Sequence, residues 1–431
     1  MSSTSLLTRS PNERFYHPEL DVLRFFAFVL IFVHHSMPHE AAFYSRFGLA
    51  PVLSLAASTF AIAGCFAVQL FLLLSAYLVT ELFIRERAFR GHIDLKSFYR
   101  RRLLRIWPLY IAFLALAWAM QWFVPGQHIG WRAELAFALF VGNWWVVFVG
   151  FPSSVIFPLW FISVQEQFYL FWPATMRKLS ARGLLLAAAA MLATANLTRW
   201  YLGSQHTWES KIWCNTFVQL DAIACGIILA VLLAGRAPRL TALHRAALFL
   251  GGVACFALAA SYFRIKADPL TLPRLLLGYP VAALGAVALF LATLRPAPAA
   301  GAASVAAYPP APVATGGPHP PVVGECGVVG RWPIIAGRWP IIARSWQMWG
   351  LRPLIYLGRI SFGLYVFHIV GLVISDYTVH HQDSSLGRYF FREAVAFAIT
   401  VTLAAISYRW LETPFLTLKQ RFSHVPSRPG G

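Results

Sequence analysis

The sequence predicts an all-α integral membrane protein with about ten transmembrane helices and one further segment that is re-entrant or interfacial. Two features of its composition support this class: 58% of the 431 residues are hydrophobic, and only 12% are charged. Soluble domains carry about twice that share of charged residues. The third observation is the recurrence of apolar runs of roughly 17 to 25 residues, each long enough to cross a hydrocarbon core about 30 Å thick.

Windows of about 19 residues identify the candidate spans. There are ten of them, at residues 20–38, 62–84, 105–124, 158–176, 183–201, 215–234, 246–263, 275–294, 353–375 and 393–411. A shorter apolar segment at 134–149 is interrupted or followed by Gly142, Gly150 and Pro152. We expect this shorter segment to be the re-entrant or interfacial one.

The distribution of charge predicts the orientation. The formal net charge is +19, from 36 Lys and Arg against 17 Asp and Glu. The basic residues gather between apolar runs, which is typical of loops retained in the cytoplasm, so they do not indicate a nucleic-acid partner. The most basic connection, at 85–105, places both termini in the cytoplasm, provided that 134–149 does not span. We therefore expect a multi-pass protein of the inner membrane.

The membrane domain is predicted to be divided by a linker. A cytoplasmic N-terminal tail (1–19) precedes the first part of the domain (20–294); a linker rich in Ala, Pro and Gly (295–351), the last two helices (352–415) and a cytoplasmic C-terminal tail (416–431) follow. The linker contains GRWPIIA twice in succession, at 330–336 and 337–343. Two short copies cannot form a solenoid, which leaves a local duplication or a weak interfacial anchor through Trp332 and Trp339.

The first span carries charge that needs a reason, because an ionisable side chain inside a bilayer costs at least about 2.5 kcal/mol. At about 100° per residue, the eleven steps from Arg24 to His35 bring both residues onto one face, about 16 Å apart. His34 points about 80° away and is expected to pack or to lie at the interface. A histidine can take the proton of a hydroxyl that attacks a thioester. The spacing favours an interhelical packing histidine equally well.

The third span opens with FYRRRLLRIWPLY, in which Arg102 and Arg105 are three residues apart and face the same way. Guanidinium groups bind phosphate oxygens bidentately, which would suit the tail of coenzyme A. An anchor that follows the positive-inside rule explains the same cluster.

A polar cluster interrupts the aromatic segment PLWFISVQEQFYLFWP, which contains Ser163, Gln165, Glu166 and Gln167. Polar side chains are costly in lipid, so these are expected to face a cavity or each other. A carboxylate here could orient or charge-balance an active-site histidine. The same reasoning applies to Glu412, for which a simple interfacial position is the alternative.

Six segments in order resemble the acyltransferase type 3 membrane family, whose members O-acylate surface polysaccharides, peptidoglycan, nodulation factors and antibiotics. They span residues 20–415 and read LDVLRFFAFVLIFVHHS, LFLLLSAYLVT, YRRRLLRIWPLY, PLWFISVQEQFYLFWP, LGRISFGLYVFH and SYRWLETPF. The resemblance implies that His35 is the catalytic histidine, that Arg24 is its paired arginine, and that Arg102 and Arg105 bind the acyl donor.

The resemblance also implies that Ser361, Tyr365 and His368 lie near the site. One departure concerns the family's usual SVExQFY, because this chain has Gln165 where the glutamate stands and Glu166 next along. Either Glu166 takes over after a small rotation of the helix, or Gln165 keeps only a hydrogen-bonding role.

The prediction is therefore a membrane-bound O-acyltransferase with His35, Arg24 and Glu166 as catalytic residues. It would move an acyl group, acetyl among the candidates, from acyl-CoA to a hydroxyl of a cell-surface or secreted carbohydrate or a glycolipid. Acyl-CoA is a donor substrate here, and no permanently bound cofactor, metal ion or nucleic acid is expected. A transporter or flippase for a glycan or small anion is the alternative, although the chain shows no internal repeat. The change at Gln165 keeps an inactive scaffold open as well.

Overall fold

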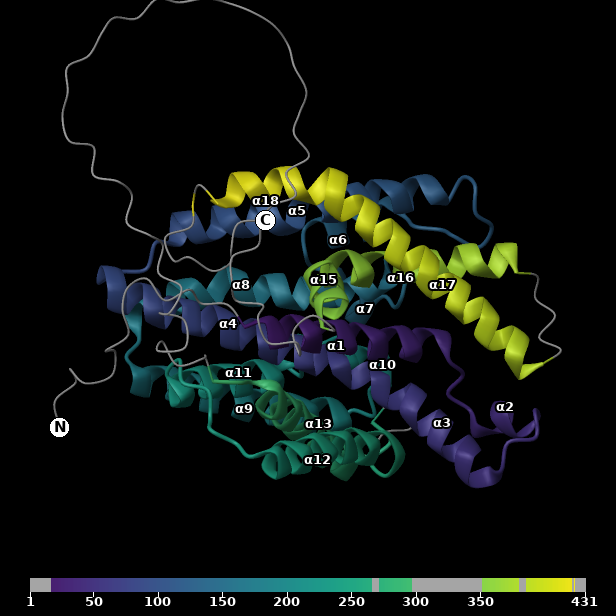
Figure 1. The fold of residues 1–431 in the computed structure, drawn as a ribbon, viewed down its shortest axis with the longest axis horizontal. Helices are drawn as coiled ribbons and strands as arrows, with labels where there is room; N and C mark the ends of the chain where they lie inside the picture. Colours follow the sequence, from purple (N-terminus) through teal and green to yellow (C-terminus); the bar gives the residue numbers. More distant parts are fainter. Residues whose placement is uncertain (1–16, 266–270, 297–350, 380–384, 421, 423–431) are drawn as a thin grey trace, which may run out of the picture.

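A computed structural model describes residues 17–265, 271–296, 351–379, 385–420 and 422. Residues 1–16 of the predicted N-terminal tail, most of the linker with both GRWPIIA copies, and the end of the C-terminal tail lie outside the described residues. Every regular element within the described ranges is a helix. The helices form one bundle in which most elements run roughly parallel to the long axis (Figure 1).

The first half of the chain contains α1 (Pro18–Ser36), α2 (Ala41–Ser45), α3 (Pro51–Ala63), η1 (Gly64–Phe66), α4 (Ala67–Arg90), α5 (Leu95–Met120), α6 (Trp131–Ala138), α7 (Gly142–Phe148), η2 (Phe157–Leu159), α8 (Trp160–Lys178) and α9 (Ala181–Ser204). The second half contains α10 (Glu209–Trp213), α11 (Leu220–Leu233), α12 (Ala242–Ser261), α13 (Leu272–Thr293), α15 (Arg352–Arg359), α16 (Ser361–Thr378), α17 (Leu386–Ser407), the π-helical turn η5 (Tyr408–Glu412) and α18 (Thr413–Gln420). Thus α1 begins inside the predicted N-terminal tail, and α18 extends past residue 415 into the predicted C-terminal one.

Seven helical stretches in the described part of the chain are long and apolar enough to cross a membrane. They are residues 51–90, α5, α9, α12, α13, α16 and residues 386–419. The predicted number of about ten spans is not confirmed, although a helix lies at each predicted position. The remaining three helices are α1, which carries Glu19, Asp21 and Arg24; α8, which carries the polar cluster; and α11, which has 14 residues.

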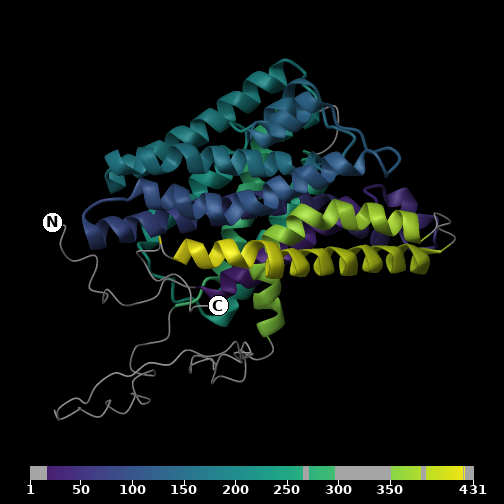
Figure 2. The ribbon, with the colours of Figure 1, turned by 90° about the horizontal axis from the view of Figure 1, so that it is seen from above.

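Helix α1 runs through the middle of the bundle, where it packs against α4, α15, α16, α3 and η1. The pairs α12 with α13, α16 with α17, and α4 with α11 share the most extensive contacts. Helices α17, η5 and α18 follow one another along one side of the bundle (Figure 2). The charged residues of α1 are therefore enclosed by other helices.

The connection between α4 and α5 is fixed by local hydrogen bonds. Gly91 ends α4 with φ of 76°, a left-handed conformation that glycine adopts at little cost. Asp94 caps α5, because its carboxylate accepts from the backbone N–H of Ser97 at 3.0 Å. Glu86, one turn before the end of α4, accepts from the backbone N–H of Asp94 at 3.0 Å. This tight turn brings the arginines at the start of α5 next to the end of α4.

The segment predicted not to span forms α6 and α7, helices of 8 and 7 residues, too short to cross a membrane.

A polar network holds α7 against α8. The Gln167 amide donates to Asn143 Oδ1 at 2.8 Å and accepts from the Thr216 hydroxyl at 2.7 Å. The Asn143 amide in turn donates to Thr216 Oγ1 at 2.9 Å. Because each side chain is hydrogen-bonded, the network can lie inside the bundle at low cost.

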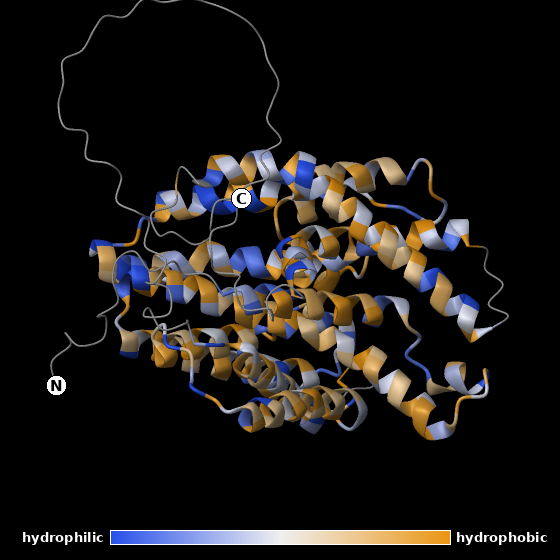
Figure 3. Cartoon of the chain, in the orientation of Figure 1, coloured by the Kyte–Doolittle hydropathy of each residue, from blue (hydrophilic) through white to orange (hydrophobic). Residues whose placement is uncertain are grey.

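The outer helices expose apolar side chains. In α9 and α12, only 17% of the most apolar window is buried inside the protein. Apolar residues dominate these outer helices, whereas hydrophilic residues gather where α4 and α5 meet (Figure 3). The outer surface is thus suited to contact with lipid. The end of the bundle where α4 meets α5 carries a run of basic residues, and we call it the basic end; these residues are Arg85, Arg87, Arg90, Arg100, Arg101 and Arg102.

A buried ion pair joins α9 to α11. The Arg199 guanidinium donates to both oxygens of the Asp221 carboxylate, at 2.7 and 2.6 Å. It also lies over the ring of Tyr279 on α13, with Cζ 5.1 Å from the ring centroid. Both charged side chains are almost completely buried. The pair therefore ties three helices together through a bidentate, fully desolvated contact.

We expect Arg199→Ala to destabilise the protein by about 3–5 kcal/mol, because it leaves the Asp221 carboxylate buried without its cation. Thermal unfolding of the detergent-purified protein measures the effect. Arg182→Ala, an exposed arginine on the same helix, is the matched control and should unfold as the wild type does. Equal unfolding temperatures for Arg199→Ala and Arg182→Ala would contradict the prediction.

Candidate active site

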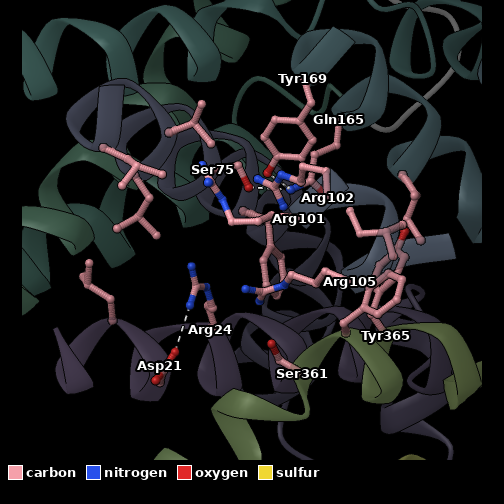
Figure 4. Close-up of a pocket in the computed structure, with 18 of the residues that line it drawn as sticks. Asp21, Arg24, Ser75, Arg101, Arg102, Arg105, Gln165, Tyr169, Ser361 and Tyr365 are labelled. Atoms are coloured by element: carbon pink, nitrogen blue, oxygen red, sulfur yellow. Dashed lines mark hydrogen bonds and ion pairs between the residues drawn. The ribbon is translucent and has the colours of Figure 1, made fainter. Parts of the chain in front are cut away.

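A cavity of about 260 Å³ opens among α1, α4, α5, α8 and α16. It is lined by basic side chains, by two carboxylates and by apolar and aromatic groups. The charged lining residues are Asp21, Arg24, Glu86, Arg101, Arg102, Arg105 and Lys419. Figure 4 shows the guanidinium groups of Arg24 and Arg105 pointing into the same space. The cavity therefore concentrates positive charge inside an otherwise apolar bundle.

Arg24 is held by its own helix. Its guanidinium donates to the Asp21 carboxylate at 2.8 Å, one turn earlier on α1. The Asp21 side chain is almost completely buried, whereas Arg24 is partly exposed to the cavity. Gly358 of α15 packs directly on the Asp21 carbonyl, and a Cβ atom would collide with that oxygen. The ion pair and this close approach together orient Arg24 toward the cavity.

Arg102 is oriented by aromatic stacking. Its Cζ lies 3.4 Å from the centroid of the Tyr169 ring on α8. The Gln165 amide donates to the Tyr169 hydroxyl at 2.6 Å and to the Ser75 hydroxyl at 2.5 Å. Gln165 thus makes two hydrogen bonds at the cavity wall. A chain of contacts from α4 through α8 to α5 holds the Arg102 guanidinium flat against the wall (Figure 4).

Two basic residues of the lining were not predicted. Arg101 donates to the backbone carbonyl of Phe422 at 2.6 Å, and Lys419 reaches the cavity from α18. Glu412, in the π-helical turn before α18, is buried and interacts electrostatically with Arg105. The C-terminal helix therefore contributes to the basic end of the cavity. The RRRLLR run signalled Arg101, whereas nothing in the sequence connected Lys419 to this site.

The predicted catalytic histidine pairs with another histidine. His35 Nδ1 lies 3.1 Å from Nε2 of His368 on α16 and 3.1 Å from the Ile31 carbonyl. His368 is completely buried, and its Nδ1 lies 2.6 Å from the Tyr365 carbonyl. Neither histidine lines the cavity, but Tyr365 does. The pair lies beyond Tyr365, on the side away from the basic end.

The hydrogen bonds assign the proton positions. A carbonyl oxygen only accepts, so Nδ1 of His368 carries the proton that it donates to Tyr365. In the neutral ring, Nε2 of His368 then accepts, and Nδ1 of His35 is the donor. This tautomer puts the basic lone pair of His35 on Nε2. The arrangement is that of a general base oriented by a second group.

The other predicted residues separate into two groups. Arg24, Arg102 and Arg105 come together at the cavity, although they arise from two helices. Glu166 does not line the cavity: it interacts electrostatically with Arg102, and within the described part of the chain its Oε1 is buried without a hydrogen-bond partner. His34 contacts the Ala61 carbonyl at 3.0 Å and stacks on His39, in line with a packing role. The structure thus brings His368, rather than Glu166, to His35.

No cluster suited to a metal ion occurs in the ranges that the structure describes, where groups of three or more His, Cys, Asp or Glu were sought. The groups that the structure gathers at the site are arginines, polar side chains and the two histidines. These groups are suited to binding an anionic ligand and to moving a proton.

Comparison with known proteins identifies the family. The family described as an acyltransferase domain, type 3, matches residues 17–409. The O-acetyltransferase OatA of Staphylococcus aureus strain NCTC 8325 / PS 47 is 24% identical, over 96% of this chain and 60% of its own. A provisionally named O-acetyltransferase of S. aureus strain MRSA252 is 23% identical, over 84% of this chain and 55% of its own.

The chain thus spans little more than half the length of the curated relatives that it matches. No solved structure matches it significantly. The family match covers the arginine-lined cavity and the paired histidines, as well as most of the apolar helices. The chain is a multi-pass membrane protein that belongs to the type 3 acyltransferase family.

Proposed function

We propose that this protein transfers an acyl group from acyl-CoA to a hydroxyl of a cell-surface or secreted carbohydrate or a glycolipid. The observation that carries this proposal is the pairing of an arginine-lined cavity with two hydrogen-bonded histidines just beyond its Tyr365 wall. The cavity can bind an anionic donor, and the histidine pair can activate a hydroxyl. The printed names of the relatives, which are O-acetyltransferases, support a hydroxyl acceptor.

The donor is inferred from the charge of the cavity. Arg24, Arg102 and Arg105 present planar guanidinium groups, which bind phosphate oxygens bidentately. The volume of about 260 Å³ is slightly below that of typical ligand pockets, about 300–1,000 Å³. We therefore expect the cavity to receive the thioester arm of acyl-CoA, with the phosphates at the basic end.

The acceptor is expected to approach from the opposite end of α1. There Tyr389 of α17 donates to the Ser36 carbonyl, next to His35. Arg392 lies over the Tyr389 ring at 4.7 Å and 3.5 Å from the Asp376 carboxylate. Aromatic and charged side chains at this end suit a polar, hydroxyl-bearing acceptor. The positive-inside rule favours placing the basic end on the cytoplasmic side of the inner membrane, in which case acyl transfer would cross the bilayer.

The reaction follows from these positions. Nε2 of His35 takes the proton of the acceptor hydroxyl as its oxygen bonds to the thioester carbonyl carbon. The carbon–sulfur bond then breaks, and the sulfur leaves with the electron pair and takes up a proton. The products are an O-acyl ester and free coenzyme A. His368 acts by positioning, since it fixes the ring and tautomer of His35.

His35→Ala should lower acyl transfer by about 10²–10⁴-fold, the contribution typical of a general base. Mass spectrometry of surface and secreted glycans and glycolipids, from cells with the intact gene, without it, and with the variant, measures the acylated product. His34→Ala removes the neighbouring imidazole and is the matched control, which should retain the acyl mass. Unchanged acylation in His35→Ala, with normal amounts of protein in the membrane, would refute the assignment.

His368→Phe should lower kcat by about tenfold to a hundredfold and leave the KM for acyl-CoA unchanged, because Phe cannot accept from His35 and His368 does not line the cavity. His368→Gln restores an acceptor and should recover most of the lost rate. Labelled acetyl transfer in membrane vesicles gives both constants. If His368→Gln had a kcat as low as that of His368→Phe, His368 would have only a packing role.

Arg102→Ala should raise the KM for acyl-CoA by about 10–100-fold, because a charge-assisted hydrogen bond contributes about 1.5–3 kcal/mol. Arg102→Lys should be intermediate, since it keeps the charge but loses the planar fork. The control is Arg132→Ala, which removes an exposed arginine stacked on Trp131 outside the cavity. An unchanged KM in Arg102→Ala would leave the anchoring of α5 as the role of this residue.

A further inference from the structure

Three aromatic rings from three helices form a row at one end of the cavity. Phe71 of α4 and Phe161 of α8 have ring centroids 6.2 Å apart. Phe161 and Tyr365 of α16 meet edge to face at 5.5 Å. All three side chains line the cavity. We call these three rings the aromatic wall.

The aromatic wall lies opposite the charged groups. Phe71 and Glu86 both line the cavity from α4. Fifteen residues separate them, which is about 22 Å along a helix. The cavity therefore extends from the basic end toward the aromatic wall, and a donor that binds by its phosphates would point its acyl group at the wall.

The paired histidines lie directly behind the aromatic wall. The rings of Tyr365 and His368 are 5.5 Å apart, and those of His368 and His35 are 4.9 Å apart. The Tyr365 hydroxyl donates to the Pro158 carbonyl at 2.5 Å, just before α8 begins. Phe161 and Tyr365 are both buried. The wall is thus fixed at both of these positions, and little room remains between it and His35.

We propose that the aromatic wall sets the length of the transferred acyl group and restricts the donor to short acyl thioesters. This inference rests on the acyl-CoA donor of the proposed function. The thioester carbonyl has to come close to His35, so the acyl chain beyond it must fit among these rings. Close-packed apolar side chains do not yield easily to extra methylene groups. An apolar pocket discriminates about 10–200-fold for one methylene group.

The test compares acetyl-, butyryl-, hexanoyl- and octanoyl-CoA, each labelled in the acyl group, with inverted membrane vesicles that contain the full chain. Label in the glycan and lipid fractions gives kcat/KM for each donor. The wild type should prefer acetyl-CoA strongly. Phe161→Ala and Phe71→Ala shorten the wall, and each should raise the ratio of hexanoyl to acetyl transfer about tenfold or more.

Phe113→Ala is the matched control, because this buried ring packs on Phe367 of α16 and does not line the cavity. Its donor preference should equal that of the wild type. Phe161→Leu, a milder change, replaces Phe161→Ala if the alanine variant is not recovered folded, and should shift the ratio in the same direction.

Two results would count against the proposal and can be told apart. An unchanged chain-length preference in folded wall variants, or equal use of all four donors by the wild type, would overturn the role of the aromatic wall alone. A wild type that transfers label from none of the four thioesters would overturn the acyl-CoA donor, and the wall inference with it.

Discussion

Charged and polar groups on α1 need polar partners inside a membrane protein, and this requirement determines much of the structure. Arg24 and His35 lie on α1, which packs against helices on several sides. An isolated charge there would cost several kcal/mol. Asp21 pairs with Arg24, and His368 pairs with His35, so each finds its partner within the bundle. The cavity is the space that these partnered groups share with α5 and α8.

The same constraint explains which part of the fold could be predicted from sequence. Apolar runs mark the lipid-facing helices, and a helix is present at every predicted span. The criterion for a membrane span fails for α1 and α8, which carry polar residues of the site, and for α11, which is apolar but has only 14 residues. The polar residues of α1 and α8 contact other parts of the bundle, so these positions tolerate polar groups that a lipid-facing position would not. The polar residues of the site thus lower the hydropathy signal of α1 and α8.

From helical spacing alone, the site could be predicted only as far as contacts within one helix allow, whereas the place of His368 near the site was implied by the family resemblance. Helical periodicity places Arg24 and His35 on one face, and Arg102 and Arg105 likewise. The contact between His35 and His368 joins residues 333 positions apart, and it depends on how α16 packs against α1. No rule based on spacing along a helix predicts a contact between residues so far apart in the sequence. Glu166 itself does not line the cavity, because adjacent residues on a helix point about 100° apart and Gln165 takes the position at the cavity. Its predicted catalytic role stays a prediction.

In the proposed reaction, separate binding of donor and acceptor would also protect the thioester. A general base next to an activated acyl group would promote hydrolysis if water reached both at once. In this structure the buried ring of Tyr365 lies between the cavity and the histidine pair, and His368 has no exposed surface. The proposed base, His35, is thus separated from the cavity by an aromatic side chain. In the proposed reaction, transfer would occur only when an acceptor hydroxyl reaches His35 while the acyl group lies against this ring.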